Sequence, residues 1–159
     1  MNANAYAVVP YCTDHTENVW LIDRLCFVDP WLKRTFIGEL EAACALNRVA
    51  ADAAFRVLGF CFGRTIADEY TIHRLAVHPA WQRRRIAQVM LRTCMRHAAL
   101  QGARHCHIEV RSGNTAAQRL YHACGFERIG IRNGYYCVGG EDAILMHCTL
   151  DGMPGSKNA

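Results

Sequence analysis

The segment DEYTIHRLAVHPAWQRRRIAQVML, residues 68–91, indicates an α/β architecture because it joins a strand pattern directly to a helix pattern. Residues 68–78 have the composition of a strand, and Pro79 ends it because proline offers no N–H to a sheet. From Arg83 to Leu100, apolar residues recur at helical spacing. Three arginines, residues 83–85, stand where this helix begins. A helix N-terminus already carries unpaired N–H groups and partial positive charge, so the added charge indicates either a solvated end or an anion site.

The other segments place this unit in an α/β (α+β) domain. Asp14 or Thr16 is a candidate N-cap of a first helix, and Asp29 followed by Pro30 predicts the start of a second. A short helix is expected from Asn114 or Thr115 to a C-terminal stop at Gly125. Strands are expected in a hairpin over 47–65 that turns at 51–54, and at 104–110, 126–131, 135–138 and 142–150. Helices and strands do not strictly alternate, which favours a mixed central sheet with helices on both faces.

Length and composition bound the function. The 159 residues predict one domain over 1–150 and a flexible polar tail over 151–159. The net charge of +4 is too small for a dedicated nucleic-acid binder but suits one local anion site. No apolar run approaches the roughly 20 residues that span a bilayer, and residues 1–14 lack a signal-peptide pattern. We therefore expect a cytoplasmic protein that binds neither membrane nor nucleic acid directly.

The nine cysteines raise the question of disulfides or metal. Their number is odd, no Cys-x-x-Cys pair occurs, and most have apolar neighbours, which favours reduced core cysteines. The tripeptide His105-Cys106-His107 resembles part of a metal site, because the two histidines would share one face of a strand. A third and a fourth ligand are not evident, so no metal site is expected.

Two motifs resemble the GCN5-related N-acetyltransferase (GNAT) family. QRRRIA, residues 82–87, resembles its Q/R-x-x-G-x-G/A signature, and residues 109–127 are similar to its E-V-R-x-x-N-x-x-A-x-x-L-Y-x-x-x-G-F hallmark. Residues 130–146 resemble the G-x-R-x-x-Y-Y-x-x-x-x-E-D-A-x-x-M ending of the RimI-type subfamily, and residues 27–40 resemble its F-x-x-P-W segment. The resemblance extends from about Val19 to Leu150.

This resemblance implies a single GNAT-type domain whose sheet contains a splayed parallel strand pair. It implies acetyl transfer from acetyl-CoA to a protein N-terminus, in the subfamily the N-terminal alanine of a small-subunit ribosomal protein. An N-terminal amine, with a pKa of about 7.7–8.0, is more easily deprotonated than a lysine near 10.4. By resemblance Glu109 is the general base and Tyr121 the general acid. The implied cofactor-binding residues are Leu75, Ala76, Val77, Arg83, Arg84, Arg85, Ile86, Ala87, Gln88 and Asn114, and the implied acceptor-binding residues are Trp31, Tyr135, Tyr136, Glu141 and Asp142.

The sequence departs from the family pattern at three positions. Arg85 stands where the signature has its first glycine, which normally permits close approach to phosphate or a positive φ. Leu32 replaces the serine that follows Pro-Trp in the subfamily. Arg74 replaces the asparagine that precedes three apolar residues, here 75–77. Arg85 bears on cofactor affinity, and the other two bear on peptide preference.

Several alternatives remain open from the sequence. The acceptor could be a lysine side chain or a small amine, and Arg85 would suit a non-catalytic acyl-CoA-binding regulatory module. An RNA-contacting basic domain lacks the aromatic–basic motif it would need. Glu109 could form an ordinary salt bridge, Tyr121 could be a core aromatic, and Asn114 could serve only as a helix cap. The candidate acceptor residues at 135–142 could be cross-strand pairs, and we expect a monomer or a weak homodimer.

Overall fold

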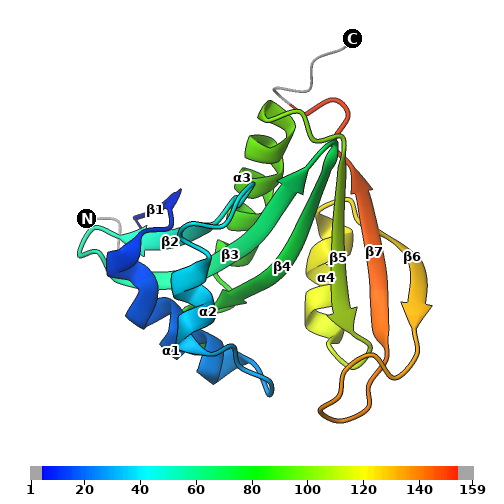
Figure 1. Ribbon diagram of the computed structural model, residues 1–159, viewed down its shortest axis with the longest axis horizontal. Helices are drawn as coiled ribbons and strands as arrows, with labels where there is room; N and C mark the ends of the chain where they lie inside the picture. Colours follow the sequence, from blue (N-terminus) through cyan, green and yellow to red (C-terminus); the bar gives the residue numbers. More distant parts are fainter. Residues whose placement is uncertain (1–4, 154–159) are drawn as a thin grey trace.

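A computed structural model describes residues 5–153 and contains one mixed seven-stranded sheet in the order β1-β2-β3-β4-β5-β7-β6 (Figure 1). The β4–β5 pair is parallel and the other neighbouring pairs are antiparallel. The strands are β1 Tyr6–Pro10, β2 Arg48–Asp52, β3 Val57–Ile66, β4 Glu69–Val77, β5 His105–Arg111, β6 Glu127–Arg132 and β7 Ala143–Thr149.

Helices cover both faces of this sheet (Figure 1). On one face lie α1 (Thr16–Cys26) and α2 (Lys33–Gly38), and on the other lie α3 (Ile86–Leu100) and α4 (Thr115–Ala123). Two 3-10 turns, η1 (Thr13–His15) and η2 (Pro79–Trp81), precede α1 and α3. Under α1 and α2, Phe36, Phe60 and Phe62 pack edge to face with ring centroids 5.3–5.9 Å apart. The larger core lies under α3 and α4.

The parallel pair of the sheet is splayed. Strands β4 and β5 pair only from Glu69 opposite His105 to Ile72 opposite Ile108, and beyond this point they diverge (Figure 1). A β-bulge in β4 lies at the same place, since Arg74 is opposite Phe62 and Ile72 is opposite Gly63. The predicted mixed sheet with a splayed parallel pair and helices on both faces is confirmed.

Two predicted helix starts are wrong. The second helix begins at Lys33 rather than at Pro30, because the carboxylate of Asp29 lies 3.2 Å from Arg111 Nη2 instead of capping a helix. Neither Asp14 nor Thr16 caps α1, whose N-cap is His15. The Thr16 hydroxyl lies 2.7 Å from the Tyr11 hydroxyl and is thereby engaged.

One strand prediction is wrong, and one strand was not predicted. Residues 135–138 form no strand, because they belong to a loop in which Gly134, Gly139 and Gly140 have positive φ and Arg111 binds the carbonyl of Val138. Strand β1 was not predicted, since five residues ending in proline give too short a pattern, yet it pairs with β2 along its whole length.

The cysteines are free thiols, and Cys61, Cys94, Cys106, Cys124 and Cys148 are buried. His105 and His107 share a face of β5 as expected, and His147 of β7 joins them, with 3.1 Å between His105 Nδ1 and His147 Nε2. Within residues 5–153, no group of three or more His, Cys, Asp or Glu side chains is arranged to hold a metal ion.

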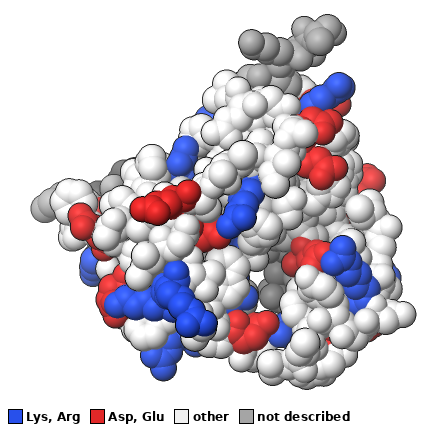
Figure 2. All heavy atoms as spheres, in the orientation of Figure 1, with Lys and Arg blue, Asp and Glu red and all other residues white. Residues whose placement is uncertain are grey.

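No helix among the described residues is long and apolar enough to cross a membrane. Basic and acidic side chains are interspersed over the face seen in Figure 2 and form no single basic field. Of the predicted tail, Asp151 lies 3.7 Å from Arg104 and residues 154–159 lie outside the described part, so the 151–159 boundary stays a prediction.

Candidate active site

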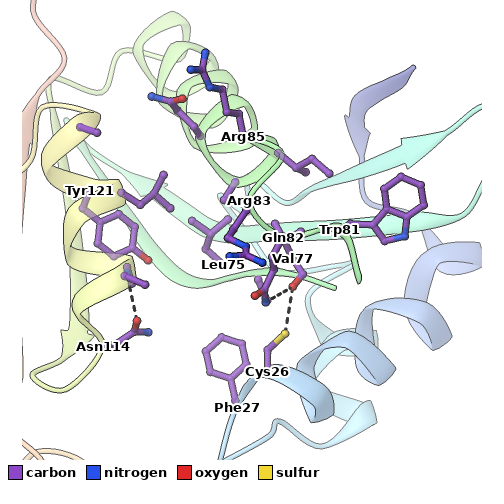
Figure 3. Close-up of a pocket in the computed structure, with 18 residues that line it drawn as sticks. Cys26, Phe27, Leu75, Val77, Trp81, Gln82, Arg83, Arg85, Asn114 and Tyr121 are labelled. Atoms are coloured by element: carbon purple, nitrogen blue, oxygen red, sulfur yellow. Dashed lines mark hydrogen bonds between the residues drawn. The ribbon is translucent and has the colours of Figure 1, made fainter. Parts of the chain in front are cut away.

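A cleft of about 540 Å³ lies where β4 and β5 diverge (Figure 3). Its walls come from the end of β4, the start of α3, the helix α4 and the end of α1. The predicted residues that line it are Leu75, Ala76, Val77, Arg83, Arg85, Ile86, Ala87, Gln88, Asn114 and Tyr121. Residues that sequence reasoning missed are Cys26, Phe27, Trp81, Gln82, Ala116, Ala117, Leu120 and Ala123.

The N-terminus of α3 opens into this cleft. The Val89 N–H donates to the carbonyl of Arg85 at 3.0 Å and closes the first helical turn. The N–H groups of Ile86, Ala87 and Gln88 therefore have no partner within the helix. The N-cap, Arg85, makes no side-chain capping hydrogen bond. This end of the helix can hold an anion through backbone N–H groups and the helix dipole.

The arginine loop adopts a backbone that normally suits glycine. Arg83 and Arg85 have φ of 59° and 62°, in the left-handed region. Both line the cleft, whereas the Arg84 guanidinium stacks 4.7 Å from the Trp81 ring centre and Arg84 lines a separate cavity of about 250 Å³. The structure thus explains the missing glycine: Arg85 accepts the positive φ itself, and Arg84 is the one predicted cofactor residue outside the cleft.

Replacing Arg85 with glycine is expected to raise the free energy of unfolding by about 0.5–1 kcal/mol. Relief of the left-handed strain is worth about 1–2 kcal/mol, and the added freedom of glycine in the unfolded chain offsets about 0.5–1 kcal/mol of it. Acetyl-CoA affinity should stay within about threefold, because backbone N–H groups supply the anion site. Urea unfolding and calorimetric titration measure both quantities.

Arg84→Gly is the matched control, because Arg84 lies in the same loop without a positive φ. It should not stabilise the protein. A destabilised Arg85→Gly variant, or a loss of affinity above about tenfold, would show that the guanidinium of Arg85 carries the site.

The end of β4 offers backbone groups to the cleft. The His78 N–H donates to Leu58 of β3 at 2.8 Å, and backbone groups alternate between the two edges of a strand. Val77 and Leu75 therefore face the edge that β5 has left. The Val77 carbonyl on this edge accepts from Gln82 Nε2 at 3.0 Å and from Cys26 Sγ at 3.4 Å. Gln82 and Cys26, both missed in the sequence, fix this edge of the cleft.

Tyr121 supplies a buried hydroxyl. Its side chain is 5% exposed, packs on Phe126 with ring centroids 5.7 Å apart, and points its hydroxyl into the cleft (Figure 3). Burial raises the pKa of Tyr121 well above its ordinary value, so the hydroxyl remains protonated. Tyr121 is therefore both a core aromatic and a donor aimed at the cavity. Asn114 likewise caps α4, with its Oδ1 3.1 Å from the Ala117 nitrogen, and lines the cleft.

Glu109 lies beside the cleft rather than in its lining. It is on the face of β5 that carries His107, and its Oε1 lies 2.9 Å from Arg132 Nη1. A hydrogen bond to Glu109 is the main cause that raises the pKa of Tyr135. The salt bridge considered from the sequence is thus present, at the open face of the splayed strands.

The loop between β6 and β7 contains the remaining predicted acceptor residues. Glu141 accepts from the Gly113 N–H at 3.0 Å and Asp142 from the Gly134 N–H at 2.8 Å, so both carboxylates hold loop backbone. Tyr135 and Tyr136 pack at right angles with ring centroids 5.2 Å apart. They are not the cross-strand pairs of a hairpin, because this segment is a loop.

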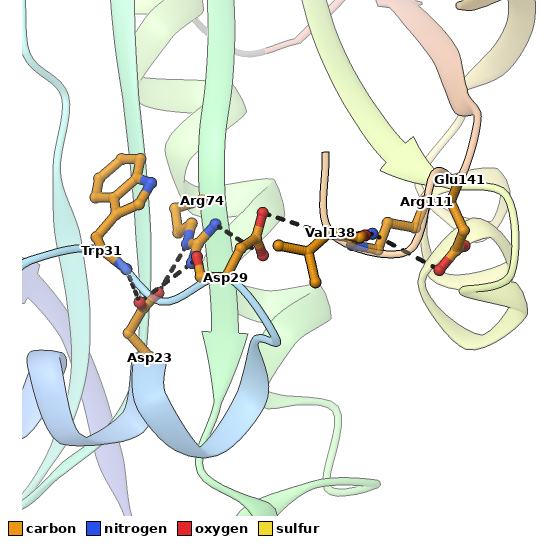
Figure 4. A network of polar contacts seen from close by, with 7 residues as sticks. All are labelled: Asp23, Asp29, Trp31, Arg74, Arg111, Val138 and Glu141. Carbon is orange, nitrogen blue, oxygen red and sulfur yellow. Dashed lines mark hydrogen bonds and ion pairs between the residues drawn. The ribbon is translucent and has the colours of Figure 1, made fainter. Parts of the chain in front are cut away.

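A chain of ion pairs links this loop to the segment between α1 and α2 (Figure 4). Buried Arg74 donates to Asp23 at 2.7 and 3.1 Å and to the Asp29 carbonyl at 2.8 Å. Asp23 also accepts from the Trp31 N–H at 2.7 Å, which places Trp31 here. The Asp29 carboxylate reaches Arg111 at 3.2 Å, and Arg111 lies 3.7 Å from Glu141. These ion pairs cross the opening between the diverging ends of β4 and β5.

Comparison with known proteins identifies this arrangement. The model of the acetyltransferase (GNAT) family matches residues 16–126. The chain belongs to this family. As a GNAT acetyltransferase it is an acetyl-CoA-dependent N-acetyltransferase, and the family, enzyme class and cofactor predicted from the sequence are confirmed.

Two relatives and one solved structure show which members of the GNAT family this chain resembles. A ribosomal protein bS18-alanine N-acetyltransferase of Salmonella typhimurium is 33% identical over 129 residues, which are 80% of this chain and 86% of the relative. The N-alpha-acetyltransferase RimI of Mycobacterium tuberculosis is 38% identical over 122 residues, which are 74% of this chain and 75% of the relative. The crystal structure of the ribosomal-protein-S18-alanine N-acetyltransferase from Escherichia coli superposes with a TM-score of 0.85 at 25% identity, covering 98% of this chain and all of the other.

Proposed function

We propose that this GNAT enzyme acetylates the N-terminal α-amine of a protein, and specifically the N-terminal alanine of a small-subunit ribosomal protein. The Salmonella typhimurium relative is named for that reaction and the Mycobacterium tuberculosis relative for N-alpha-acetylation, and the matched regions cover 86% and 75% of those two proteins. The observation that carries the proposal is the meeting, in one cleft, of the open N-terminus of α3 with the buried hydroxyl of Tyr121. Such a cleft can bind an anion at one end and supplies its own proton donor at the other.

The cleft fits acetyl-CoA, which supplies an acetyl group activated as a thioester when it is bound. Backbone N–H groups of Ile86, Ala87 and Gln88, with Arg83 and Arg85 beside them, hold the pyrophosphate. The open edge of β4 at Leu75 and Val77 aligns the pantetheine arm, and Asn114 lines its path. The buried Tyr121 hydroxyl donates a hydrogen bond to the departing sulfur.

The acceptor amine enters on the face of the splay where Glu109 lies. Glu109 accepts a proton from the amine, directly or through water. Trp31, Tyr135 and Tyr136 flank this face, while Glu141 and Asp142 act by holding the loop that carries the tyrosines. The acceptor thus enters from the opposite side of the sheet to Tyr121, so that both substrates can be bound and aligned at the same time.

The remaining parts of the proposal concern the setting of the reaction. A ribosomal acceptor places the enzyme in the cytoplasm, and free thiols suit that compartment. Basic and acidic side chains are interspersed on the face seen in Figure 2, and we propose that the protein binds no nucleic acid directly. We also propose a monomer or a weak homodimer with one domain over 1–150.

The acceptor is tested by mass spectrometry of a peptide that begins Ala-Arg and carries an internal lysine, incubated with the enzyme and acetyl-CoA. We expect one acetyl group on the α-amine, because about a tenth of such amines are already neutral at pH 7, against far fewer lysines. The same peptide with a blocked N-terminus is the control and should stay unmodified. Acetylation at the internal lysine alone would refute the N-terminal acceptor.

A further inference from the structure

The bulge in β4 places an unassigned histidine next to the predicted base. Ile72 is in the core under α3, so alternation puts the side chain of the next residue, His73, on the face of the sheet covered by α1. The extra residue of the bulge puts Arg74 on this face too, where it reaches Asp23 of α1. Leu75 then returns to the core side. His73 and Arg74 therefore share one face although they are consecutive.

Strand register brings Glu109 to the same point. Ile72 opposite Ile108 is the last pair of the parallel ladder, and both side chains are buried in the core under α3. The next residue of each strand, His73 in β4 and Glu109 in β5, lies on the opposite face, where the strands begin to part. The Glu109 carboxylate is close enough to His73 to act on its pKa. The His73 side chain is exposed, so it also meets solvent.

His73 is neutral at neutral pH. Partial burial of its ring lowers its pKa and Arg64 of β3 lowers it further, whereas Glu39 at the end of α2 and Glu109 of β5 raise it, and the net shift is downward. A neutral imidazole with a solvent-exposed edge can take a proton on one nitrogen and release one from the other.

The reaction requires such a group. An N-terminal amine is mostly an ammonium at pH 7, since its pKa is about 7.7–8.0. It must lose one proton before it can attack and a second as the new C–N bond forms, while the departing thiolate gains one. The balance is R–NH₃⁺ plus acetyl thioester giving R–NH–acetyl, thiol and one H⁺. Glu109 can hold one proton at a time, so the net proton needs a path to solvent.

We propose that His73 is the relay residue that carries this proton from the acceptor and Glu109 to solvent. This inference rests on the proposed function only in that the acceptor is an amine protonated at neutral pH. It assigns a role to a position outside the motifs that identify the family.

The test compares His73→Gln with wild type in kcat/KM for the acceptor from pH 6.5 to pH 9. We expect a loss of about tenfold at pH 7, below the roughly 100- to 10,000-fold of a direct general acid or base because His73 only relays the proton, and a loss near zero at pH 9, where the amine is already neutral. Neutral imidazole should restore activity to His73→Ala in proportion to its concentration. Acetyl-CoA affinity should not change.

His107→Gln is the matched control, since His107 lies on the same face of β5, within the paired part of the ladder. It should match wild type at every pH. The acceptor is whichever amine mass spectrometry shows the wild type to modify, so a failure of the N-terminal proposal leaves this test intact; with a lysine acceptor the curves converge at higher pH. Equal activity of His73→Gln and wild type at pH 7 would overturn the inference. So would a deficit that is the same at both pH values and insensitive to imidazole.

Discussion

Replacing Tyr121 with phenylalanine should lower kcat by about 100-fold or more and leave the KM for acetyl-CoA within about twofold. The substitution removes one oxygen from a side chain that is 5% exposed and otherwise packed in the core. The hydroxyl points into the cleft where the thiolate must leave, so its loss acts on the step in which charge develops on sulfur. Steady-state kinetics with both substrates varied measure the two parameters.

Tyr6→Phe is a suitable control because it makes the same change on the edge strand β1, outside the cleft. It should retain full activity. The thermal shift produced by acetyl-CoA should be the same for wild type and Tyr121→Phe, which separates binding from chemistry. A Tyr121→Phe enzyme with unchanged kcat would remove Tyr121 from the mechanism, and no thermal shift in the wild type would contradict the cofactor site.

The raised pKa of Tyr121 sharpens its proposed role. Proton transfer from a phenol with an ordinary pKa near 10 to the thiolate of a thiol with a pKa near 8.5 is uphill by about 1.5 pKa units, or roughly 2 kcal/mol. Burial raises the pKa of Tyr121 and makes complete transfer costlier, while it keeps the hydroxyl protonated as a donor. Stabilisation of the thiolate by a strong hydrogen bond is therefore the main contribution. Ionisation of Tyr121 should produce no alkaline decline in activity up to about pH 10.

The parts of the fold predicted correctly are those with long or specific local patterns. Helix α3 has apolar residues at helical spacing over four turns, and β4 ends two residues before a proline. The local composition of segment 135–138 predicts a strand because two tyrosines and a valine favour strands. Three nearby glycines with positive φ, and the Arg111 contact to Val138, hold it in a loop instead.

The predicted cofactor residues depended on contiguous motifs, and all but Arg84 line the cleft. The missed residues Cys26 and Phe27 come from the end of α1, about fifty residues away from Val77, which Cys26 contacts. No local pattern encodes such a contact. The sequence likewise gives no sign of the bulge at His73, because the register between two strands depends on pairing along their whole length. The motif at residue 109 was enough to identify Glu109 as a candidate base. Its ion pair with Arg132 could not be predicted, because it depends on how β6 packs beside β7 and β5 in the sheet.

Replacing Arg74 with methionine should lower the free energy of unfolding by about 3–5 kcal/mol, because it leaves a buried carboxylate without its cation. Asp23 is fully buried, and Arg74 is 9% exposed and stacks 3.7 Å from the Phe27 ring centre. Methionine retains most of the apolar stem and its packing, so the loss reports mainly on charge. Urea unfolding of the two proteins gives the difference.

A double variant decides whether the buried charge is the cause. Adding Asp23→Asn to Arg74→Met removes the charge but leaves an oxygen for the Trp31 N–H, so at least about half of the lost stability should return. No recovery would mean that Arg74 stabilises the protein by packing on Phe27 and Trp31.

The same pair of variants measures what the arginine contributes to the acceptor side, since Arg74 fixes Asp29 and Trp31 beside the diverging strands. Because the residues proposed to bind acetyl-CoA are unchanged, the KM for the acceptor peptide should rise in Arg74→Met more than the KM for acetyl-CoA does.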